Sequence, residues 1–208
     1  MQQVQPVIIL LDDDESVLRS LKRLFLLAGY AVTAYSRAGE FLENMPLDGE
    51  GCLVMDLRMP NMSGLEVQQA AHAKGCTMPF VFISGHGEVP AVVQAMKAGA
   101  TDFLEKPVLP EVLMKAVEKA LASGRIGNRK RRIENDAQDR VGKLSPRERE
   151  VCELVAQGLL NKQIATALGT SEKTVKAQRG NAIKKIRAGS TAELLNLLYL
   201  AGRPRIGG

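Results

Sequence analysis

A short apolar run that ends in acids, Val7-Ile8-Ile9-Leu10-Leu11-Asp12-Asp13-Asp14, stands near the start of the chain. Such a run of β-branched and leucine residues is typical of a strand that is buried on both faces of a parallel sheet. The segment 16–28 then carries apolar residues at intervals of three and four and is followed by Gly29, which predicts a helix with a glycine at its C-terminal end.

The same alternation of strand and helix continues to residue 121. Further strands are predicted over 31–35, 51–55, 79–84 and 101–104. Further helices are predicted over 64–73, 89–98 and 109–121, together with one that starts at Ser36. Five strand–helix units in succession predict a doubly wound, five-stranded parallel sheet with helices on both faces.

Polar side chains with complementary chemistry follow the predicted strands. Asp12 and Asp13 end the first strand, Asp56 follows the third, Ser84 ends the fourth and Lys106 lies just after the fifth. In such sheets ligands bind beyond the carboxyl ends of the strands, so we expect these five side chains to converge.

The chemistry of this set favours a phosphoryl acceptor. Clustered carboxylates repel one another unless a cation lies among them, and oxygen ligands suit Mg²⁺. A carboxylate beside that ion is a candidate nucleophile toward phosphorus and would form an acyl phosphate. Lys106 and the metal would then offset charge on the phosphoryl oxygens, while the Ser84 hydroxyl would donate a hydrogen bond to one of them.

Charge divides the chain into two parts. Residues 1–122 hold ten Lys and Arg against fifteen Asp and Glu, a net charge of −5, whereas residues 123–208 hold eighteen against eight, a net charge of +10. An acidic module joined to a basic one is typical of a polyanion binder with a separate input domain. The polar segment 123–142 is predicted to be a linker, and its run 129–132 is interpreted as solvated charge, with contact to a DNA backbone as the alternative.

Three helix patterns follow this linker. Ser145-Pro146-Arg147-Glu148 combines an N-cap serine, a proline at the first helical position and a glutamate three residues after the cap. Gly158 ends this helix, 161–168 is predicted to form the next, Gly169-Thr170 makes a turn, and Ser171 starts a third. This order predicts a small all-α helix-turn-helix domain over residues 143–208.

The third helix of this domain is predicted to enter the DNA major groove. Its side opposite Val175 and Ile186 carries small residues among cations, which allows close approach to a groove. The predicted DNA contacts are Lys162, Lys173, Thr174, Lys176, Ala177, Gln178, Asn181 and Lys184. Arg179 projects toward the buried side and is expected to pair with Glu148 or Glu150.

Four motifs of the first part resemble the receiver domain of bacterial two-component response regulators, a flavodoxin-like fold. They are Leu11-Asp12-Asp13-Asp14, Met55-Asp56-Leu57-Arg58-Met59-Pro60, Ile83-Ser84-Gly85-His86-Gly87 and Asp102-Phe103-Leu104-Glu105-Lys106-Pro107. The resemblance covers residues 5–122 and implies that Asp56 accepts a phosphoryl group from a sensor histidine kinase. It also implies that Asp13, Asp56 and the backbone carbonyl of Arg58 hold Mg²⁺, with Asp12 acting through water.

The same resemblance implies a switch. Ser84 is expected to shift toward the phosphate and Phe103 to turn inward, which changes the surface of the helix over 89–98, the strand over 101–104 and the helix after them. The Lys106–Pro107 peptide bond is expected to be cis.

Motifs of the second part resemble the LuxR-type helix-turn-helix. They are Ser145-Pro146-Arg147-Glu148-Arg149-Glu150-Val151, Asn161-Lys162-Gln163-Ile164-Ala165 and Lys173-Thr174-Val175-Lys176. With the receiver, the whole chain resembles a response regulator of the FixJ/NarL type. It departs from the family at Gln178, where histidine is common, and at Gly180, which lowers helix propensity by roughly 1 kcal/mol. A fourth helix over 190–199 is implied, whose leucines serve either dimer contact or packing.

This architecture implies a regulator of transcription whose DNA binding is controlled by phosphorylation. The expected partners are a sensor histidine kinase, double-stranded promoter DNA and a second copy of the chain after phosphorylation, with RNA polymerase as a further candidate. No enzymatic activity is expected beyond self-phosphorylation and slow autodephosphorylation of Asp56. The alternative is a constitutive DNA-binding regulator whose receiver serves only as a dimerisation platform, and the intact set of five site residues argues against it.

Several other classes are disfavoured. No apolar run approaches the roughly 20 residues of a membrane helix, so no signal peptide, membrane span or membrane partner is expected. Cys52, Cys76 and Cys152 show neither CxxC nor His-paired spacing, so neither a disulfide framework nor a zinc site is suggested. A reducing cytoplasm is the expected location.

Overall fold

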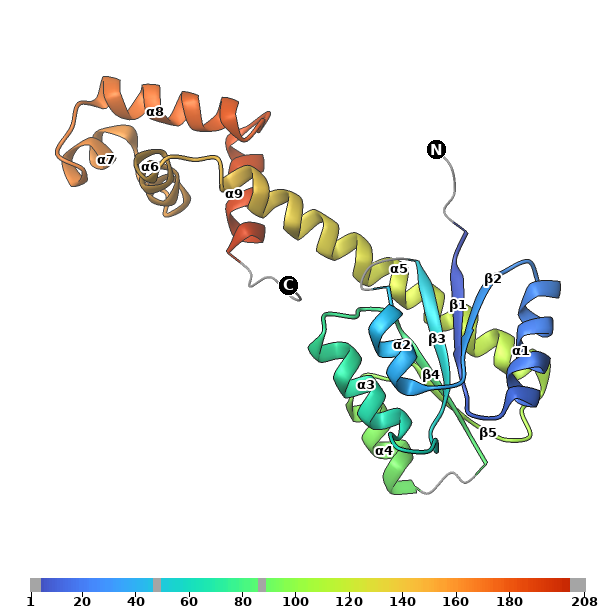
Figure 1. Cartoon of the computed structure of the whole chain (residues 1–208). Helices are drawn as coiled ribbons and strands as arrows, with labels where there is room; N and C mark the ends of the chain where they lie inside the picture. Colours follow the sequence, from blue (N-terminus) through green and yellow to red (C-terminus); the bar gives the residue numbers. More distant parts are fainter. Residues whose placement is uncertain (1–4, 47–49, 86–88, 203–208) are drawn as a thin grey trace. The chain divides into compact units, whose positions relative to one another are not determined.

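The computed structural model describes residues 5–46, 50–85 and 89–202. They divide into two compact units, one that ends at Arg129 and one that begins at Lys130 (Figure 1). Each unit is described by itself.

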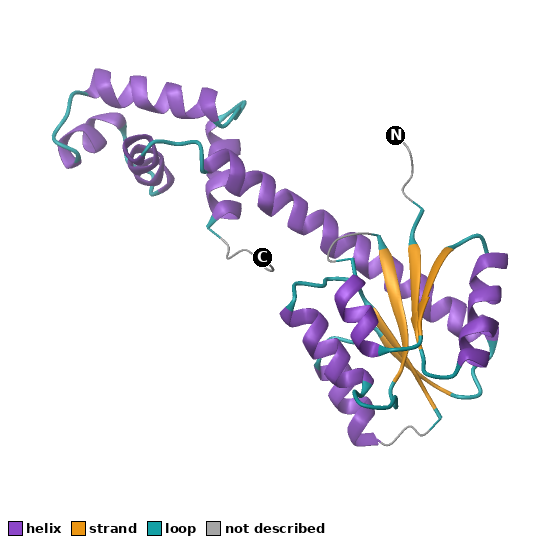
Figure 2. Ribbon diagram, viewed as in Figure 1, coloured by secondary structure: helices purple, strands orange, loops and turns teal. Residues whose placement is uncertain are grey.

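The first unit is built on a parallel sheet that lies between two layers of helices (Figure 2). Its strands are β1 (Val7–Leu11), β2 (Ala31–Tyr35), β3 (Gly51–Asp56), β4 (Phe80–Ser84) and β5 (Asp102–Glu105). Their order is β2-β1-β3-β4-β5. The predicted five-stranded, doubly wound fold is therefore confirmed.

Helices cover both faces of this sheet, because successive side chains of each strand point to opposite faces. They are α1 (Glu15–Leu27), α2 (Ala38–Asn44), α3 (Gly64–Ala73), α4 (Val89–Lys97) and α5 (Pro110–Val141). On one face Leu11 and Phe82 pack with Phe41 of α2, and on the other Leu10 packs with Phe25 of α1. Burial of each such side chain contributes roughly 1.5–3 kcal/mol.

Helix α2 starts later than predicted. It begins at Ala38, two residues after Ser36, and Arg37 at its N-cap makes no side-chain cap hydrogen bond. The Arg37 backbone is extended, with φ −135° and ψ 130°, so the serine lies outside the helix.

The second unit is all helical. After the end of α5 it contains α6 (Pro146–Ala156), α7 (Asn161–Ala167), α8 (Glu172–Lys185) and α9 (Thr191–Ala201). The predicted capping box of α6 is confirmed, because Glu148 N donates to Ser145 Oγ and Ser145 N donates to Glu148 Oε2. Gly158 and Gly169 take positive φ values of 86° and 59° where α6 and α7 end, which favours glycine at both turns.

The segment after residue 121 differs from the expectation. The sequence predicts a polar linker there, whereas α5 continues as helix to Val141, and Ala137 and Val141 are buried in the core of the helical unit. The physical reason is that this segment lacks proline and holds five arginines, and arginine is a good helix former even where no apolar stripe exists. The linker boundaries 123–142 and the domain boundaries on either side remain predictions.

Candidate functional site

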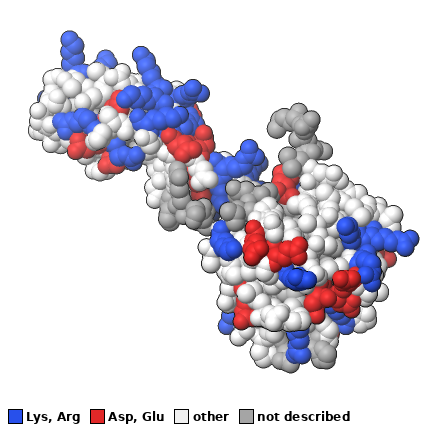
Figure 3. All heavy atoms as spheres, viewed as in Figure 1, with Lys and Arg blue, Asp and Glu red and all other residues white. Residues whose placement is uncertain are grey.

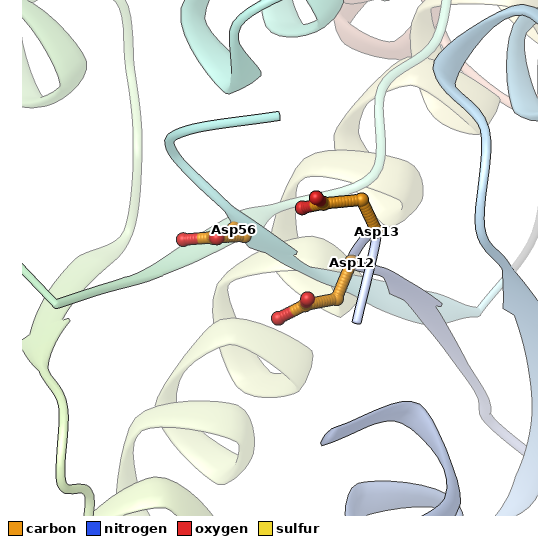
Figure 4. Close-up of side chains that lie close together, drawn as sticks. All are labelled: Asp12, Asp13 and Asp56. Carbon is orange, nitrogen blue, oxygen red and sulfur yellow. The ribbon is translucent and has the colours of Figure 1, made fainter. Parts of the chain in front are cut away.

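The carboxyl ends of β1, β3 and β4 bring the predicted site residues together, with Lys106 just beyond β5. One carboxylate oxygen from each of Asp12, Asp13 and Asp56 lies within 4.8 Å of the other two (Figure 4). Lys106 Nζ lies 2.9 Å from Asp12 Oδ2 and 3.5 Å from Asp56 Oδ2. Ser84, at the end of β4, is fully buried, and its backbone oxygen accepts a hydrogen bond from Lys106 N at 2.8 Å.

Backbone contacts fix the two inner carboxylates. Asp12 is only 3% exposed, and its Oδ1 accepts a hydrogen bond from Asp14 N at 2.9 Å. Asp56 Oδ1 accepts one from Leu57 N at 2.8 Å. Asp13 is exposed, so the cluster opens to solvent on its side. The three carboxylates therefore lie together beside the Lys106 ammonium, with Asp13 toward solvent.

Burial and neighbouring charges shift the ionisation of this site. Burial raises the pKa of the Asp56 carboxyl above its ordinary value; Lys106 opposes this shift and the charge of Asp12 adds to it. Burial acts to lower the pKa of Lys106, but the hydrogen bonds and charges of Asp12 and Asp56 outweigh it, and the net pKa is raised. Lys106 therefore stays charged at neutral pH, while an ionised Asp56 is held at a free-energy cost.

This cost predicts a pH-dependent gain in stability for Asp56→Asn. Because the pKa of Asp56 is higher in the folded than in the unfolded chain, its contribution is favourable at low pH and is lost as the pH rises through the folded value. In chelator-containing, metal-free buffer, Asp56→Asn is expected to unfold at a higher temperature than the wild type at pH 7. The difference should narrow toward about pH 4, near the ordinary carboxyl range. A gap that widens on acidification would contradict this sign.

The donor set fits Mg²⁺. All three side chains are carboxylates, the hard oxygen ligands that this ion prefers, and their mutual repulsion is relieved by a cation among them. Among the described residues, Asp12, Asp13 and Asp56 are the group found close enough to share a metal.

Other predicted residues of the first unit lie around this cluster. Arg58 follows Asp56 by two positions and its side chain is exposed. Phe103 is half-buried, with its ring centroid 6.4 Å from that of Phe82. The Lys106–Pro107 bond is cis, as expected. The motif residues His86 and Gly87 lie outside the described residues.

Most of the predicted DNA contacts are exposed on the helical unit. Lysine and arginine side chains gather over α8 (Figure 3). The exposed predicted contacts are Lys162 of α7 and Lys173, Thr174, Lys176, Ala177, Asn181 and Lys184 of α8. The Thr174 hydroxyl also shares a 2.8 Å hydrogen bond with the N-cap Ser171. A Cβ added at Gly180 of the same helix would have nothing within 4 Å.

Gln178 and Arg179 of α8 are less exposed than the contacts named above. Gln178 is only partly exposed and its Oε1 is buried, so its amide is turned more toward the protein than the other predicted contacts. The prediction for Arg179 is wrong: its guanidinium donates to Thr191 Oγ1 at 2.7 Å, whereas Lys185 Nζ lies 2.8 Å from Glu148 Oε2 and Arg147 pairs with Glu150. Lys185, at the end of α8, contacts Glu148 at the start of α6. The hydrogen bond from Lys185 lowers the pKa of the Glu148 carboxyl, and the charge of Lys185 acts in the same direction.

The two parts of the chain match two different protein families. Residues 8–118 match the family of response regulator receiver domains, and residues 142–198 match the bacterial regulatory proteins of the luxR family. The chain belongs to the two-component response regulators. This response regulator combines a receiver with a LuxR-type DNA-binding domain and acts in transcription regulation, which confirms the resemblance seen in the sequence; its family is not one of classical enzymes.

Full-length relatives support this assignment. Nodulation protein W of Bradyrhizobium diazoefficiens is 41% identical over 196 residues, covering 94% of this regulator and 86% of that protein. Transcriptional regulatory protein FixJ of Azorhizobium caulinodans is 42% identical over 193 residues, covering 92% of this chain and 91% of that one.

Two solved structures are similar over nearly their whole length. The response regulator StyR matches with a TM-score of 0.85 at 39% identity, covering 94% of this chain and 99% of that chain. Full-length FixJ from B. japonicum matches with a TM-score of 0.58 at 38% identity, covering 96% and 98%.

The family gives the acidic cluster and the helical unit their general roles. Receiver domains bind Mg²⁺ at an acidic pocket, which in this response regulator is the cluster of Asp12, Asp13 and Asp56. A receiver implies a sensor kinase as partner, and the LuxR-type domain implies DNA binding. None of the helices within 5–46, 50–85 and 89–202 has the length and apolar character that crossing a membrane requires.

The sequence patterns missed one feature of the site, the role of Gly64. A Cβ at this position would lie 2.5 Å from the backbone oxygen of Asp56 and 2.9 Å from the ring of Phe82. Only glycine lets the start of α3 come so close to the strand end that carries Asp56. The sequence did contain a sign of this role: Gly64 is the first residue of a predicted helix, a position at which a better helix former is usual.

Proposed function

We propose that Asp56 is the phosphoryl acceptor of this response regulator and that a sensor histidine kinase is the donor. The observation that carries this is the placement of the Asp56 carboxylate: it is partly exposed, lies beside two further carboxylates, and has the Lys106 ammonium 3.5 Å away. A carboxylate oxygen of Asp56 attacks phosphorus, the bond to the donor breaks, and an acyl phosphate forms.

The neighbours of Asp56 have distinct tasks in this proposal. Lys106 offsets negative charge on the phosphoryl oxygens, and the Ser84 hydroxyl donates a hydrogen bond to one of them. Asp13, Asp56 and the backbone carbonyl of Arg58 hold Mg²⁺, and Asp12 acts through water. When bound, this ion supplies further positive charge toward the phosphoryl oxygens.

The response is a change of surface. Ser84 moves toward the phosphorylated carboxylate and Phe103 turns inward, which alters the face formed by α4, β5 and the start of α5. Helix α4 has an exposed apolar side. Val89, Val93 and Met96 are spaced by four and three residues, which places them on one side of the helix, and they are 73%, 43% and 45% exposed. A second copy of the chain is the partner proposed for this face after phosphorylation.

Dimerisation links phosphorylation to DNA binding. One recognition helix contacts too few base pairs for tight specific binding, and two copies can read half-sites about 10 bp apart. Residues of α8 and Lys162 of α7 contact the promoter duplex, the cations at phosphates and Asn181 at a base edge. The remaining proposed contacts are Lys173, Thr174, Lys176, Ala177, Gln178 and Lys184. RNA polymerase is a further proposed partner, and the cytoplasm the proposed location.

DNA binding with and without a phosphodonor tests this function. The probe is a duplex selected from a random-sequence pool by the wild-type protein in acetyl phosphate and MgCl₂. Acetyl phosphate is expected to raise wild-type affinity about 5- to 150-fold, the usual range of coupling between two sites, and to leave Asp56→Asn unchanged. Equal, donor-independent affinity of both proteins would support the constitutive alternative. If neither protein bound the duplex under any condition, the DNA-binding proposal would be overturned.

A further inference from the structure

The C-terminal end of α8 is held by one side chain from α5. Arg140 Nε donates to the Ile186 carbonyl at 2.7 Å, and its Nη2 donates to the Arg187 carbonyl at 2.8 Å. The same guanidinium lies 3.5 Å from Glu193 of α9 and 3.3 Å from Asp136 of α5. Arg140 thus joins α5, the end of α8 and the start of α9 within the helical unit.

Backbone donors cap only part of this end of α8. The N–H groups of Ile186, Arg187 and Ala188 donate to carbonyls of the last turn, whereas the carbonyls of Ile186 and Arg187, just after the helix, accept from Arg140. A cation at this end also interacts favourably with the helix dipole. Moreover, Arg187 takes a left-handed conformation with φ 54°, which a residue with a Cβ adopts only where its surroundings hold it. Arg140 donates to the carbonyl of this same residue.

The contact is built into the core of the helical unit. Ala137 and Val141, on either side of Arg140 in α5, are buried in one cluster with Ala182 and Ile186 of α8. The Arg140 side chain is only 22% exposed and its donors are directed at protein oxygens. It is therefore occupied inside the unit instead of being available to DNA.

We propose that Arg140 is a positioning residue for DNA recognition. By holding the carbonyls of Ile186 and Arg187, just after α8, against α5, it sets the orientation in which α8 presents Asn181 and its lysines to the duplex. The inference rests on the proposed DNA-reading role of α8. Base-edge contacts need that orientation, whereas contacts of flexible lysines with phosphates tolerate a change in it.

The test compares two duplexes of equal length at one salt concentration, one selected from a random pool by the wild-type protein and one of mixed sequence. Arg140→Gln in the full-length chain is expected to lower affinity for the selected duplex on the order of tenfold, the loss of about one base contact, and for the mixed duplex by less than about threefold. Arg132→Gln, an exposed arginine of the same helix, removes the same charge and should leave the ratio of the two affinities unchanged.

Arg140→Lys separates geometry from charge. Lysine keeps the charge but lacks the fork that reaches both carbonyls, so the affinity ratio should stay below that of the wild type. Far-UV circular dichroism checks that each variant is folded. If Arg140→Gln does not fold, the affinity ratio of Arg140→Lys is compared with that of the wild type instead. Equal losses on both duplexes, no loss, or full recovery with Arg140→Lys would overturn the inference. If the wild type itself showed no preference between the duplexes, the proposed function would fail instead.

Discussion

Asp56→Asn is expected to abolish phosphoryl uptake from acetyl phosphate in the presence of MgCl₂. The amide has nearly the same shape as the carboxylate but carries neither its charge nor its nucleophilic oxygen. Intact-mass spectrometry of the wild type should show the added mass of one phosphoryl group, and the variant should show none. Neutral hydroxylamine should remove the wild-type adduct, because acyl phosphates react with it.

A matched control is available in the same unit. Asp102 is partly exposed, pairs with Lys119 at 3.2 Å, and begins β5 at the end of the sheet opposite to Asp56. Asp102→Asn should therefore take up a phosphoryl group as the wild type does. An adduct on the Asp56 variant of the same extent as on the wild type would show that another side chain is the acceptor.

Gly64→Ala is expected to destabilise the receiver by about 1–3 kcal/mol, the usual range for overpacking. Its Cβ would approach the Asp56 carbonyl oxygen to 2.5 Å and Leu57 Cα to 3.1 Å, and neither backbone atom can move without shifting the end of β3. The Gly64 N–H also donates to the Leu57 carbonyl at 2.8 Å, so a displaced α3 would lose this contact. Thermal and urea unfolding measure the loss.

Gly39→Ala provides the contrast. Gly39 lies in α2, and a Cβ there would have nothing within 4 Å. Alanine at this helical position is expected to be neutral or to stabilise by up to about 1 kcal/mol. If both glycine variants lost the same stability, steric contact with the Asp56 strand end would not be the cause.

The convergence of the site was predictable because topology alone produces it. Parallel strands end at one edge, so residues as distant as Asp12 and Lys106 meet once the strands have been recognised. The helix starts at Ser145 and Ser171 were predictable for a similar reason, since their caps are local in sequence.

Contacts between helices were less accessible to sequence reasoning. A helical wheel places Arg179 on the inner side of α8 but does not tell whether Arg179 or Lys185 reaches Glu148, which depends on the crossing of α6 and α8. The helical state of the α5 extension was missed because its apolar residues form no stripe, and Arg140 meets its partners 46 and 47 positions later in the chain. Gly64 was missed because a Cβ clash exists only in three dimensions.

The open space around Gly180 bears on what a substitution there would change. Replacing this glycine would add a side chain to α8 without displacing any neighbour, and it would also remove a helix-weakening residue worth roughly 1 kcal/mol. Within the helical unit such a substitution meets no steric barrier at its Cβ. Because small residues on this side of α8 allow close approach to a groove, a larger side chain at Gly180 would act on the distance to the duplex and not on the packing of the domain.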